Sequence, residues 1–476
     1  MSKIVVIGGG PAGMFAAYEL SKNGQEVTLV ESGLDVEERK KAIAQEDSAG
    51  PHYIAGMGGS GTFSDGKLNL HPEIGGDLKE FVSRSEAESL ISYVDKIFTT
   101  HGAPKESEIS PEARKLEIRA MREGLKFIPI RQKHIGSDVL PSVVVSINKE
   151  MESFGLEVLI KTAATDLIIK NGKVTGVKIK KGAKESILPA DYVIIAPGRA
   201  GSQWLLDLAK EKGIGFRYGP LDIGVRVEVP NEVMEEVTKI SWDPKFHIRT
   251  KKYDDFVRTF CTNPSGFVIT ENYGKFVSVN GHSMKNKTSN NTNFAFLVRM
   301  ALTHPVENTT QYGRSICMLA TTIGGGKAIL QRLGDLKAGH RSTWERIEKS
   351  YVEPTNKDVT PGDIAMALPA RIVEDLVGGL DMLAKVVPGV NDVSTLLYAP
   401  EVKFKSIRLD ISKKLETKEV KNLFTAGDGA GVSGGIIPAA VTGLIAAKEI
   451  LSRCNSPSGC QHGDSRPARP EGAATR

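Results

Sequence analysis

The chain has 476 residues, with 40% hydrophobic and 25% charged side chains, a composition that excludes collagen-like, coiled-coil and largely disordered classes. Lysine and arginine number 62 and aspartate and glutamate 57, and the formal net charge of +5 gives no sign of a dedicated nucleic-acid binder. The length corresponds to about two to three domains. Glycine is in excess, with 49 residues, and its clusters carry most of the functional signals.

Cysteine use and the N-terminal sequence indicate a reducing compartment. The four cysteines form no C-x-x-C pair and no disulfide framework. Cys454, Cys460 and His462 lack a fourth ligand and the spacing of a zinc site, so we expect no metal. The N-terminus has no signal-peptide pattern, and the longest apolar run, 436–450, is too short to span a bilayer. We therefore expect a cytoplasmic protein with no membrane span.

The first 31 residues have the pattern of a strand, a helix and a second strand. Residues 3–7 (KIVVI) are a short apolar run that predicts a buried parallel strand, residues 11–22 have helical spacing, and residues 26–31 (EVTLVE) predict the second strand. The turn at 8–13 has the spacing G-x-G-x-x-G. In this position between a strand and a helix, the motif predicts a dinucleotide-binding turn.

Each part of this turn has a physical role in holding a dinucleotide. Gly8 permits the tight turn, Gly10 lets the backbone approach a pyrophosphate, and Gly13 lets the helix pack closely on the sheet. The helix N-terminus offers unpaired N–H groups and the positive end of its dipole. Glu31 ends the second strand, where its carboxylate can accept hydrogen bonds from a ribose diol and would repel a 2′-phosphate.

The next part of the chain mixes helices and strands. A glycine-rich loop covers 56–66, residues 78–155 are expected to be mainly helical, and residues 156–180 are expected to form a β-meander. An Asn-Gly pair at 171–172, between two alternating runs, predicts a tight hairpin. Residues 191–196 (DYVIIA) predict another buried strand, which leads into an Ala-Pro-Gly turn.

Residues 216–415 contain more aromatic side chains and polar β-like runs and no mononucleotide-type βαβ unit, which indicates a second domain. The pattern of the first residues, a short apolar run followed by glycine, recurs at 422–426 (NLFTA) and predicts a strand that ends at Gly427-Asp428. The glycines at 434–435 then open a helix of small residues. Residues 453–476, rich in Pro, Gly, Ser and Arg, predict a disordered tail.

The late strand decides between NAD and FAD. Asp428 can hold the ribityl hydroxyl groups of a flavin nucleotide. The helix that follows can point its N-terminus at the pyrimidine edge of the isoalloxazine ring, where the charge of the reduced flavin builds. A fold that binds NAD alone needs no such closing element, so we expect FAD, bound non-covalently.

Together these motifs resemble the glutathione-reductase-type FAD superfamily. More narrowly, GMGGSGTFSDGKL, GVRVE, CTNPSGFV, VNGHS and LFTAGDGAGVSGGI are similar to the FAD-dependent dehydrogenases, also called NAD(P)/FAD-dependent oxidoreductases, over nearly the whole chain. The superfamily motifs imply FAD, and the narrower family implies no established substrate.

The resemblance implies a set of cofactor-binding residues. They are Gly8, Gly10, Pro11, Ala12, Gly13, Glu31, Ser32, Arg39, Gly59, Ser60, Gly61, Lys67, Ala164, Ala196, Pro197, Gly198, Gly427, Asp428, Gly435, Ile436 and Ile437. Arg39 is expected to cap the ribose end, and Ala164 to touch the adenine from a strand. Pro197 replaces the usual Thr of the middle turn and has no N–H to donate.

Residues 61–67 (GTFSDGK) also have the spacing of a phosphate-binding P-loop. Leu68 stands where such a loop needs Ser or Thr for magnesium, and no clear strand precedes it, so a nucleoside-triphosphatase site is not favoured. The same small residues allow the backbone to lie near a flavin ring, and Lys67 could place positive charge near its N1–C2=O edge.

The candidates for catalysis are Lys67, Arg226, His282 and Glu401. The second domain has four arginines of which one or two could clamp a substrate carboxylate or phosphate, namely Arg217, Arg226, Arg258 and Arg314. His282 is a candidate proton donor because histidine exchanges protons near neutral pH. Glu401 and Lys403 lie in a possible strand that could face the substrate cleft. Structural roles remain open for all of them.

The expected architecture is α/β, a discontinuous Rossmann-like FAD-binding domain with an inserted mixed α+β substrate domain. The expected boundaries are 1–77, 143–215 and 416–452 for the FAD-binding domain, 78–142 for a helical insertion, 216–415 for the substrate domain and 453–476 for the tail.

The expected function is FAD-dependent oxidoreduction, in which a hydride passes between a small-molecule substrate and flavin N5. The glycines at 324–326 lack the Rossmann motif, so NAD(P)H would be a transient electron donor, and a protein electron partner is the other option. Two alternatives stay open. One is a protein of the same fold in cofactor biosynthesis or tRNA modification, and the other is a non-catalytic flavin-binding module. No nucleic-acid partner is expected on charge alone, and the oligomeric state is open.

Overall fold

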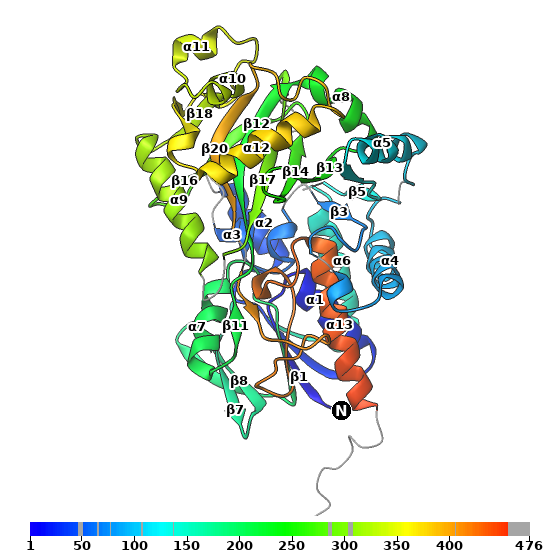
Figure 1. The fold of residues 1–476 in the computed structure, drawn as a ribbon. Helices are drawn as coiled ribbons and strands as arrows, with labels where there is room; N and C mark the ends of the chain where they lie inside the picture. The colour runs from blue at the N-terminus through cyan, green and yellow to red at the C-terminus, as the bar shows by residue number, and fades with distance from the viewer. Residues whose placement is uncertain are drawn as a thin grey trace, which may run out of the picture.

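The structure, a computed structural model, describes residues 1–45, 51–63, 66–76, 78–105, 108–136, 138–283, 288–302, 308–404 and 406–455. Figure 1 shows two sheets in the two halves of the molecule. A parallel sheet lies in the half that contains the N-terminus, and a larger mixed sheet lies in the other half.

The first sheet has five parallel strands in the order β22-β10-β1-β2-β6. They are β1 (Lys3–Ile7), β2 (Glu26–Val30), β6 (Glu157–Leu159), β10 (Tyr192–Ile195) and β22 (Leu423–Thr425). Consecutive Val and Ile residues are buried in β1 and β10, as expected for a parallel sheet covered on both faces. Because β22 pairs with β10, the sheet combines both ends of the chain.

Two helices cross on this sheet. They are α1 (Pro11–Lys22) and α13 (Ile436–Cys454), drawn in blue and red in Figure 1. α4 (Arg84–Thr100) and α6 (Leu140–Ser153) pack beside them. Together with the sheet they enclose the first apolar core, which therefore contains residues from the first and the last parts of the chain.

The second sheet has eight strands in the order β19-β18-β20-β12-β17-β14-β13-β4. They are β4 (Leu125–Ile128), β12 (Leu221–Pro230), β13 (Lys245–Arg249), β14 (Phe256–Asn263), β17 (Asn291–Met300), β18 (Ala328–Arg332), β19 (Val359–Pro361) and β20 (Leu396–Lys403). α12 (Ala370–Leu383) covers one face and encloses the second apolar core. In β12 every second residue from Leu221 to Val229 enters this core, so the residues between them form the opposite face.

Smaller elements complete the two halves. The remaining strands are β3 (Lys67–Asn69), β5 (Gln132–His134), β7 (Ala163–Lys170), β8 (Lys173–Lys181), β9 (Lys184–Pro189), β11 (Phe216–Arg217), β15 (Phe267–Asn272), β16 (Val277–His282) and β21 (Arg408–Leu409). The remaining α-helices are α2 (Val36–Gln45), α3 (Pro51–Ile54), α5 (Pro111–Arg122), α7 (Ser202–Lys212), α8 (Asn231–Ile240), α9 (Thr309–Ile323), α10 (Leu333–Lys337) and α11 (Trp344–Glu348).

The predicted α/β fold is confirmed, with a Rossmann-like parallel sheet and a mixed second sheet. The predicted hairpin at 171–172 is also confirmed, since Asn171 and Gly172 have φ values of 52° and 70° between β7 and β8.

Two segments differ from the expected pattern. The segment 78–142 contains β4 and β5 in addition to α4 and α5, because Phe127 of β4 packs on Phe246 of β13 in the second core. α13 continues beyond residue 452 to Cys454, since Arg453 is paired with Glu416 and Glu449. The rest of the predicted tail, from residue 456, lies outside the described residues, and so do Cys460 and His462.

Candidate functional site

The N-terminal glycine turn joins β1 to α1 at the carboxyl end of the parallel sheet. Gly8 has a φ of 104°, and a Cβ there would stand 2.1 Å from the carbonyl oxygen of Ala196, so only glycine fits. Gly10 precedes α1 without a side-chain cap, and the N–H groups of Ala12 and Gly13 have no hydrogen-bond partner among the described residues. The turn therefore presents free N–H groups at the positive end of the helix dipole.

Glu31 follows β2 and its carboxylate is fixed beside this turn. Its Oε2 accepts a hydrogen bond from the N–H of Gly9 at 2.7 Å, and its Oε1 accepts one from the N–H of Gly33 at 2.7 Å. The side chain is buried. A carboxylate has about four acceptor positions, and the Ser32 hydroxyl uses a third one at 3.4 Å, so one ribose hydroxyl group could still bind it.

Arg39 of α2 holds the glycine-rich loop in place. Its guanidinium is fully buried and donates to the carbonyl oxygens of His52, Met57 and Gly59 at 2.9, 2.6 and 3.1 Å. Burial lowers the pKa of Arg39 to about 10, while the charge of Glu31 opposes that shift. These contacts organise the loop, and the expected contact of Arg39 with a ribose stays a prediction.

The glycine-rich loop touches the N-termini of two helices. A Cβ on Gly59 would stand 3.0 Å from the Cα of Gly10, at the start of α1. A Cβ on Gly61 would stand 2.8 Å from the side chain of Ile436, at the start of α13. Ser60 lies between these two contacts. Small residues at 59–61 are thus required by the close approach of the loop to both helices.

The middle and late turns are also in contact. A Cβ on Gly429 would stand 2.1 Å from the carbonyl oxygen of Gly198. Asp428 Oδ1 accepts hydrogen bonds from the Ser433 hydroxyl at 2.7 Å and from the N–H of Gly435 at 3.3 Å. The Asp428 side chain therefore fixes the turn that leads into α13.

α13 provides a second free helix N-terminus. Gly435 precedes it without a side-chain cap, and in the described part of the chain the N–H groups of Ile436 and Ile437 have no hydrogen-bond partner. α13 crosses α1 so closely that a Cβ on Gly443 would stand 2.0 Å from the carbonyl oxygen of Ala12. The two uncapped N-termini thus belong to a pair of helices in direct contact.

We call residues 8–13, 59–61, 196–198 and 427–437 the turn cluster. It brings together most of the sequence-predicted cofactor residues, namely Gly8, Gly10, Pro11, Ala12, Gly13, Gly59, Ser60, Gly61, Ala196, Pro197, Gly198, Gly427, Asp428, Gly435, Ile436 and Ile437. The donor set fits FAD, because free N–H groups suit a pyrophosphate at one helix and an electron-rich ring edge at the other.

Ser32 and Ala164 lie beside Glu31. The Ser32 hydroxyl donates to Glu31 Oε1 at 3.4 Å. Ala164 is on β7, shortly after Thr162, whose N–H donates to the Glu31 carbonyl oxygen at 2.9 Å. Both positions suit the expected roles at the ribose and the adenine, which remain predictions.

The segment 66–76 connects the turn cluster with the second sheet. Gly434 donates its N–H to the carbonyl oxygen of Gly75 at 2.6 Å. Two residues before Gly75, Glu73 accepts a hydrogen bond from Lys126 of β4 at 2.9 Å. Lys67 is half-buried in β3, which packs beside α13, so its place at the start of this segment is compatible with the expected position near a flavin.

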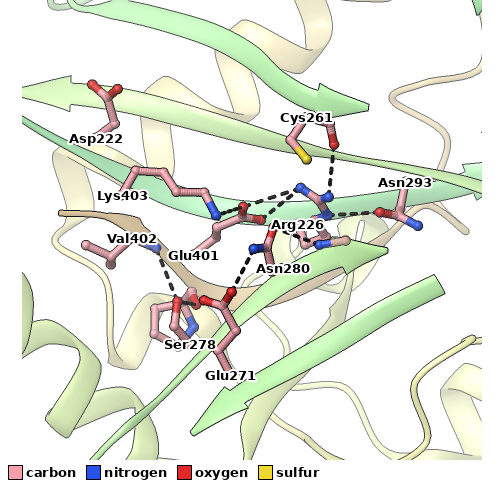
Figure 2. Close-up of polar contacts among 12 residues, drawn as sticks. Asp222, Arg226, Cys261, Glu271, Ser278, Asn280, Asn293, Glu401, Val402 and Lys403 are labelled. Atoms are coloured by element: carbon pink, nitrogen blue, oxygen red, sulfur yellow. Dashed lines mark hydrogen bonds and ion pairs between the residues drawn. The ribbon is translucent and has the colours of Figure 1, made fainter. Parts of the chain in front are cut away.

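On the face of the eight-stranded sheet opposite α12, a small apolar cluster that includes Leu396 and Tyr398 lies beside a part rich in buried charged residues, and we call this charged part the polar face. Arg226 of β12 and Glu401 of β20 are fully buried there, with Nη1 and Oε1 3.3 Å apart. Arg226 also donates to Asn293 Oδ1 and to the Cys261 carbonyl oxygen, both at 2.9 Å, and Lys403 Nζ lies 2.8 Å from Glu401 (Figure 2). Neither Arg226 nor Glu401 reaches solvent in this structure, so their catalytic roles stay predictions.

The other candidates of the second domain lie at different places. His282 is exposed at the end of β16, and the β15–β16 hairpin packs over β12 and β20 at the Arg226 end of the polar face. Arg258 is on the polar face itself. Arg217 and Arg314 are exposed on β11 and α9. The structure therefore groups Arg226, Arg258 and Glu401 and separates the other two arginines from them.

Sequence reasoning missed the partner of Arg258. Asp222 is buried on the polar face and accepts hydrogen bonds from Arg258 at 2.6 Å and from Arg299 at 3.1 Å. The signal was the alternation in residues 221–229 (LDIGVRVEV), where charged residues share the positions between apolar ones. This pattern predicts a charged face on a buried strand, which needs partners from other strands.

Two cavities in the described part of the structure differ in volume and in distance from the turn cluster. One, of about 370 Å³, lies between α4 and β5 and is lined by Asp95, Thr99, Lys133 and neighbouring polar residues, away from the turn cluster. The other is a gap of about 10 Å³ within the turn cluster, lined by residues that include Pro11, Gly61 and Ile436. The turns are thus closely packed on one another.

Among the described residues, no helix has both the length and the hydropathy needed to cross a bilayer.

Residues 2–214 match the pyridine nucleotide-disulphide oxidoreductase family, and residues 220–404 match the family described as FAD-dependent protein, C-terminal domain-like. Residues 377–457 match the glucose inhibited division protein A family. The first two matches cover the parallel sheet up to β10 and the eight-stranded sheet from β12 to β20.

Among curated proteins, an uncharacterized protein of Clostridium beijerinckii is 27% identical over an alignment of 481 positions. The alignment covers 95% of this chain and 81% of that protein. Three solved structures are similar at lower identity. THI4 of Thermovibrio ammonificans is 17% identical over 45% of this chain and 64% of that chain, with a TM-score of 0.28.

The other two structures cover most of this chain. Glycine oxidase from Bacillus cereus is 12% identical, with 95% of this chain and 96% of that chain covered and a TM-score of 0.38. L-proline dehydrogenase from P. horikoshii is 14% identical, with 95% and 93% covered and a TM-score of 0.40. Because these TM-scores are low, the likenesses to solved structures carry no functional weight. A function for this chain depends instead on the family matches and on the geometry of the turn cluster.

Proposed function

We propose, from the premise that this chain joins a pyridine nucleotide-disulphide oxidoreductase domain to an FAD-dependent protein C-terminal domain, that it is an FAD-dependent oxidoreductase acting on a small molecule. The observation that carries the proposal is the turn cluster, where the uncapped N-termini of α1 and α13 converge with the glycine turns. We propose that FAD is bound there without a covalent bond.

The residues of the turn cluster have separate roles in this proposal. The N-terminus of α1 holds the pyrophosphate, and Gly10 gives the phosphate oxygens access to the backbone. Glu31 accepts from a ribose hydroxyl group. Asp428 accepts from the ribityl chain, and the N–H groups at the start of α13 face the pyrimidine edge of the ring.

Bound FAD supplies the hydride-transfer chemistry. The chain orients the substrate, excludes water and moves the accompanying proton. We propose His282 as the group that moves this proton, because its side chain is exposed and within reach of a solvent-accessible ligand. We propose that Lys67 holds positive charge near the N1–C2=O edge. The reaction is that of a dehydrogenase or reductase in the cytoplasm, with NAD(P)H as a transient electron donor.

A matched pair of glycine variants tests the proposal. Gly10→Ala adds a methyl group whose nearest neighbour is 3.8 Å away, so the folded chain accommodates it, but the methyl group blocks a pyrophosphate at α1. Gly378→Ala on α12 adds a methyl group with no neighbour within 4 Å. We expect wild type and Gly378→Ala to show flavin absorbance after purification or after addition of FAD, and Gly10→Ala to lose it while remaining folded.

Two results would contradict the proposal. A folded wild-type protein that neither contains nor binds FAD would refute it. Flavin content in Gly10→Ala equal to that of Gly378→Ala would show that FAD does not bind at the α1 turn.

A bound adenylated product, or an RNA mobility shift at moderate salt, would instead favour cofactor biosynthesis or tRNA modification. Stopped-flow reduction by NADH, NADPH and a metabolite panel separates catalysis from a flavin-binding module.

A further inference from the structure

The polar face carries more positive than negative charge around one aromatic side chain, Phe260. The residues concerned are three carboxylates and six cations, which we call the charge cluster, namely Asp222, Asp243, Glu401, Lys67, Arg226, Lys245, Arg258, Arg299 and Lys403. The formal charge of these nine residues is +3, and it is +2 when Glu228, the other buried carboxyl of the polar face, is counted. In a partly buried place such an excess of charge is costly unless a counter-charge arrives.

Two carboxylates of the charge cluster each contact two cations. Asp222 binds Arg258 at 2.6 Å and Arg299 at 3.1 Å. Glu401 binds Arg226 at 3.3 Å and Lys403 at 2.8 Å. Because one carboxylate cannot neutralise two cations, a net positive charge remains at both places.

The third carboxylate, Asp243, contacts one cation, Lys245, and also feels the charge of Lys67. Its Oδ2 lies 2.5 Å from Lys245 Nζ. Burial raises the pKa of Asp243, but the charges of Lys245 and Lys67 outweigh this effect and hold the pKa below its ordinary value. Lys67 belongs to β3, next to the turn cluster, so the charge cluster begins where the proposed cofactor site ends.

The carboxylates of the charge cluster are buried, and several of its cations lie closer to solvent. The side chains of Asp222, Asp243 and Glu401 are at most 5% exposed. Those of Arg258 and Lys403 are 19% and 23% exposed. The surface that solvent meets is therefore positive, and the carboxylates orient the cations from behind.

Two further observations agree with a positive surface. The ring of Phe260 has Arg258, Lys245 and Lys403 at 4.6, 5.0 and 6.0 Å from its centroid. Burial lowers the pKa of His247, on the same face, to about 3, and the charges of nearby Arg258, Lys126 and Arg299 lower it further. This neighbouring histidine is thus kept neutral first by its burial and in addition by the nearby cations.

We propose that the charge cluster is the substrate-recognition surface of the enzyme and that the substrate is a small molecule with an oxyanion group, a carboxylate or a phosphate. This inference rests on the proposed function. The anion would bind the partly exposed Arg258, Arg299 and Lys403, and its remaining part would extend toward Lys67 and the turn cluster. Recognition by fixed cations explains why Asp222 and Glu401 are each shared by two cations and why all three carboxylates are buried.

The test compares small anions with a neutral analogue. The probes are oxalate, succinate and inorganic phosphate, with acetamide as the neutral control, titrated against the flavin absorbance of the holoenzyme. The same probes are added to flavin-free protein in a thermal-shift assay, so anion binding can be measured even if FAD does not bind. We expect saturable binding of at least one anion, weakened by salt, and no binding of acetamide.

Variants locate the binding. Lys403→Met leaves Glu401 paired with Arg226, and Arg299→Met leaves Asp222 paired with Arg258, so neither leaves a buried carboxylate unpaired. Each is expected to weaken anion binding about tenfold. The control, Lys252→Met, removes a cation that pairs with Glu374 on the α12 side of the sheet and is expected to change nothing.

The outcomes are distinguishable. Equal anion affinity in wild type, Lys403→Met and Arg299→Met, or binding of acetamide as tight as that of the anions, would overturn the inference. Tighter binding of phosphate than of the carboxylates identifies a phosphate ester as the substrate class, and the reverse identifies a carboxylic acid. A folded protein that does not bind added FAD but still binds anions at this surface would refute the proposed function and leave the anion site supported.

Discussion

Asp375, on α12, is a buried carboxyl beside a second carboxyl, that of Asp255. The Thr250 hydroxyl donates to Asp375 Oδ1 at 2.6 Å, and Arg371 binds both oxygens of Asp255 at 2.6 and 2.9 Å. Burial raises the pKa of Asp375 to about 6, and the hydrogen bond and charge of Asp255 add to the shift. Asp255, paired with Arg371, can therefore be charged near neutral pH without lowering the stability of the fold, whereas a charge on Asp375 lowers it.

Asp375→Asn should make the chain more resistant to unfolding at neutral pH. The folded state holds the Asp375 proton more tightly than the unfolded state, so this group stabilises the fold at low pH, and that contribution is lost as pH rises through about 6. The asparagine is neutral at every pH. The difference in unfolding free energy, variant minus wild type, should grow by about 2 kcal/mol between pH 4.5 and 7.5.

Urea unfolding of both proteins at the two pH values measures this difference. Parallel pH dependence of wild type and variant would mean that Asp375 does not keep its proton in the folded state. Arg371 stays in place in the variant, so the salt bridge to Asp255 serves as the internal control.

The crossing of α1 and α13 is the element on which the proposed cofactor site depends. Gly443 lets the two backbones meet, since a Cβ there would stand 2.0 Å from the carbonyl oxygen of Ala12. Ala12 is at the start of α1, where one free N–H group lies. A shift of α13 therefore moves the second free helix N-terminus relative to the first.

Gly443→Ala should lower both stability and FAD affinity. The added methyl group forces α13 away from α1, at a cost of about 3 kcal/mol for an overpacked contact. Gly378→Ala is the matched control, because it adds the same methyl group to a helix where no atom lies within 4 Å. Thermal unfolding with and without FAD measures both effects. A Gly443→Ala protein as stable as Gly378→Ala would contradict the close crossing.

At the level of elements, local signals predicted the turn cluster; for the charge cluster they gave five candidate residues, Lys67, Arg226, Arg258, Glu401 and Lys403, but not the pairing among its members. Strand, glycine turn, helix and Glu31 lie within one short segment, so backbone constraints alone indicate their arrangement. The pairing of Arg226 with Glu401 joins residues 175 positions apart, and that of Asp222 with Arg299 joins residues 77 apart. Such pairs depend on strand order and register, which neither residue encodes locally.

The whole molecule has two main apolar cores. One is formed by the parallel sheet with α1 and α13, and the other by the eight-stranded sheet with α12. All turns of the turn cluster are attached to the first core. Tightly bound cofactor adds stability only to the part of the chain that holds it.

FAD should therefore stabilise one half of the molecule more than the other. At about 100 times its dissociation constant, a ligand adds about 2.7 kcal/mol to the state that binds it. Trp204 packs against the first core, and Trp344 lies on α11 of the second domain. In variants with a single tryptophan, FAD should raise the unfolding midpoint reported by Trp204 more than that reported by Trp344. Equal shifts would show that the two cores unfold as one unit.

The parallel sheet takes β1 from the first residues of the chain and β22 from near residue 425, and α13 follows directly. During translation, the eight-stranded sheet is complete once β20 has left the ribosome. The N-terminal glycine turn, made first, must wait for α13, made last. If FAD binds at the turn cluster as proposed, its loading follows translation, and a nascent chain arrested before residue 436 is expected to carry no flavin.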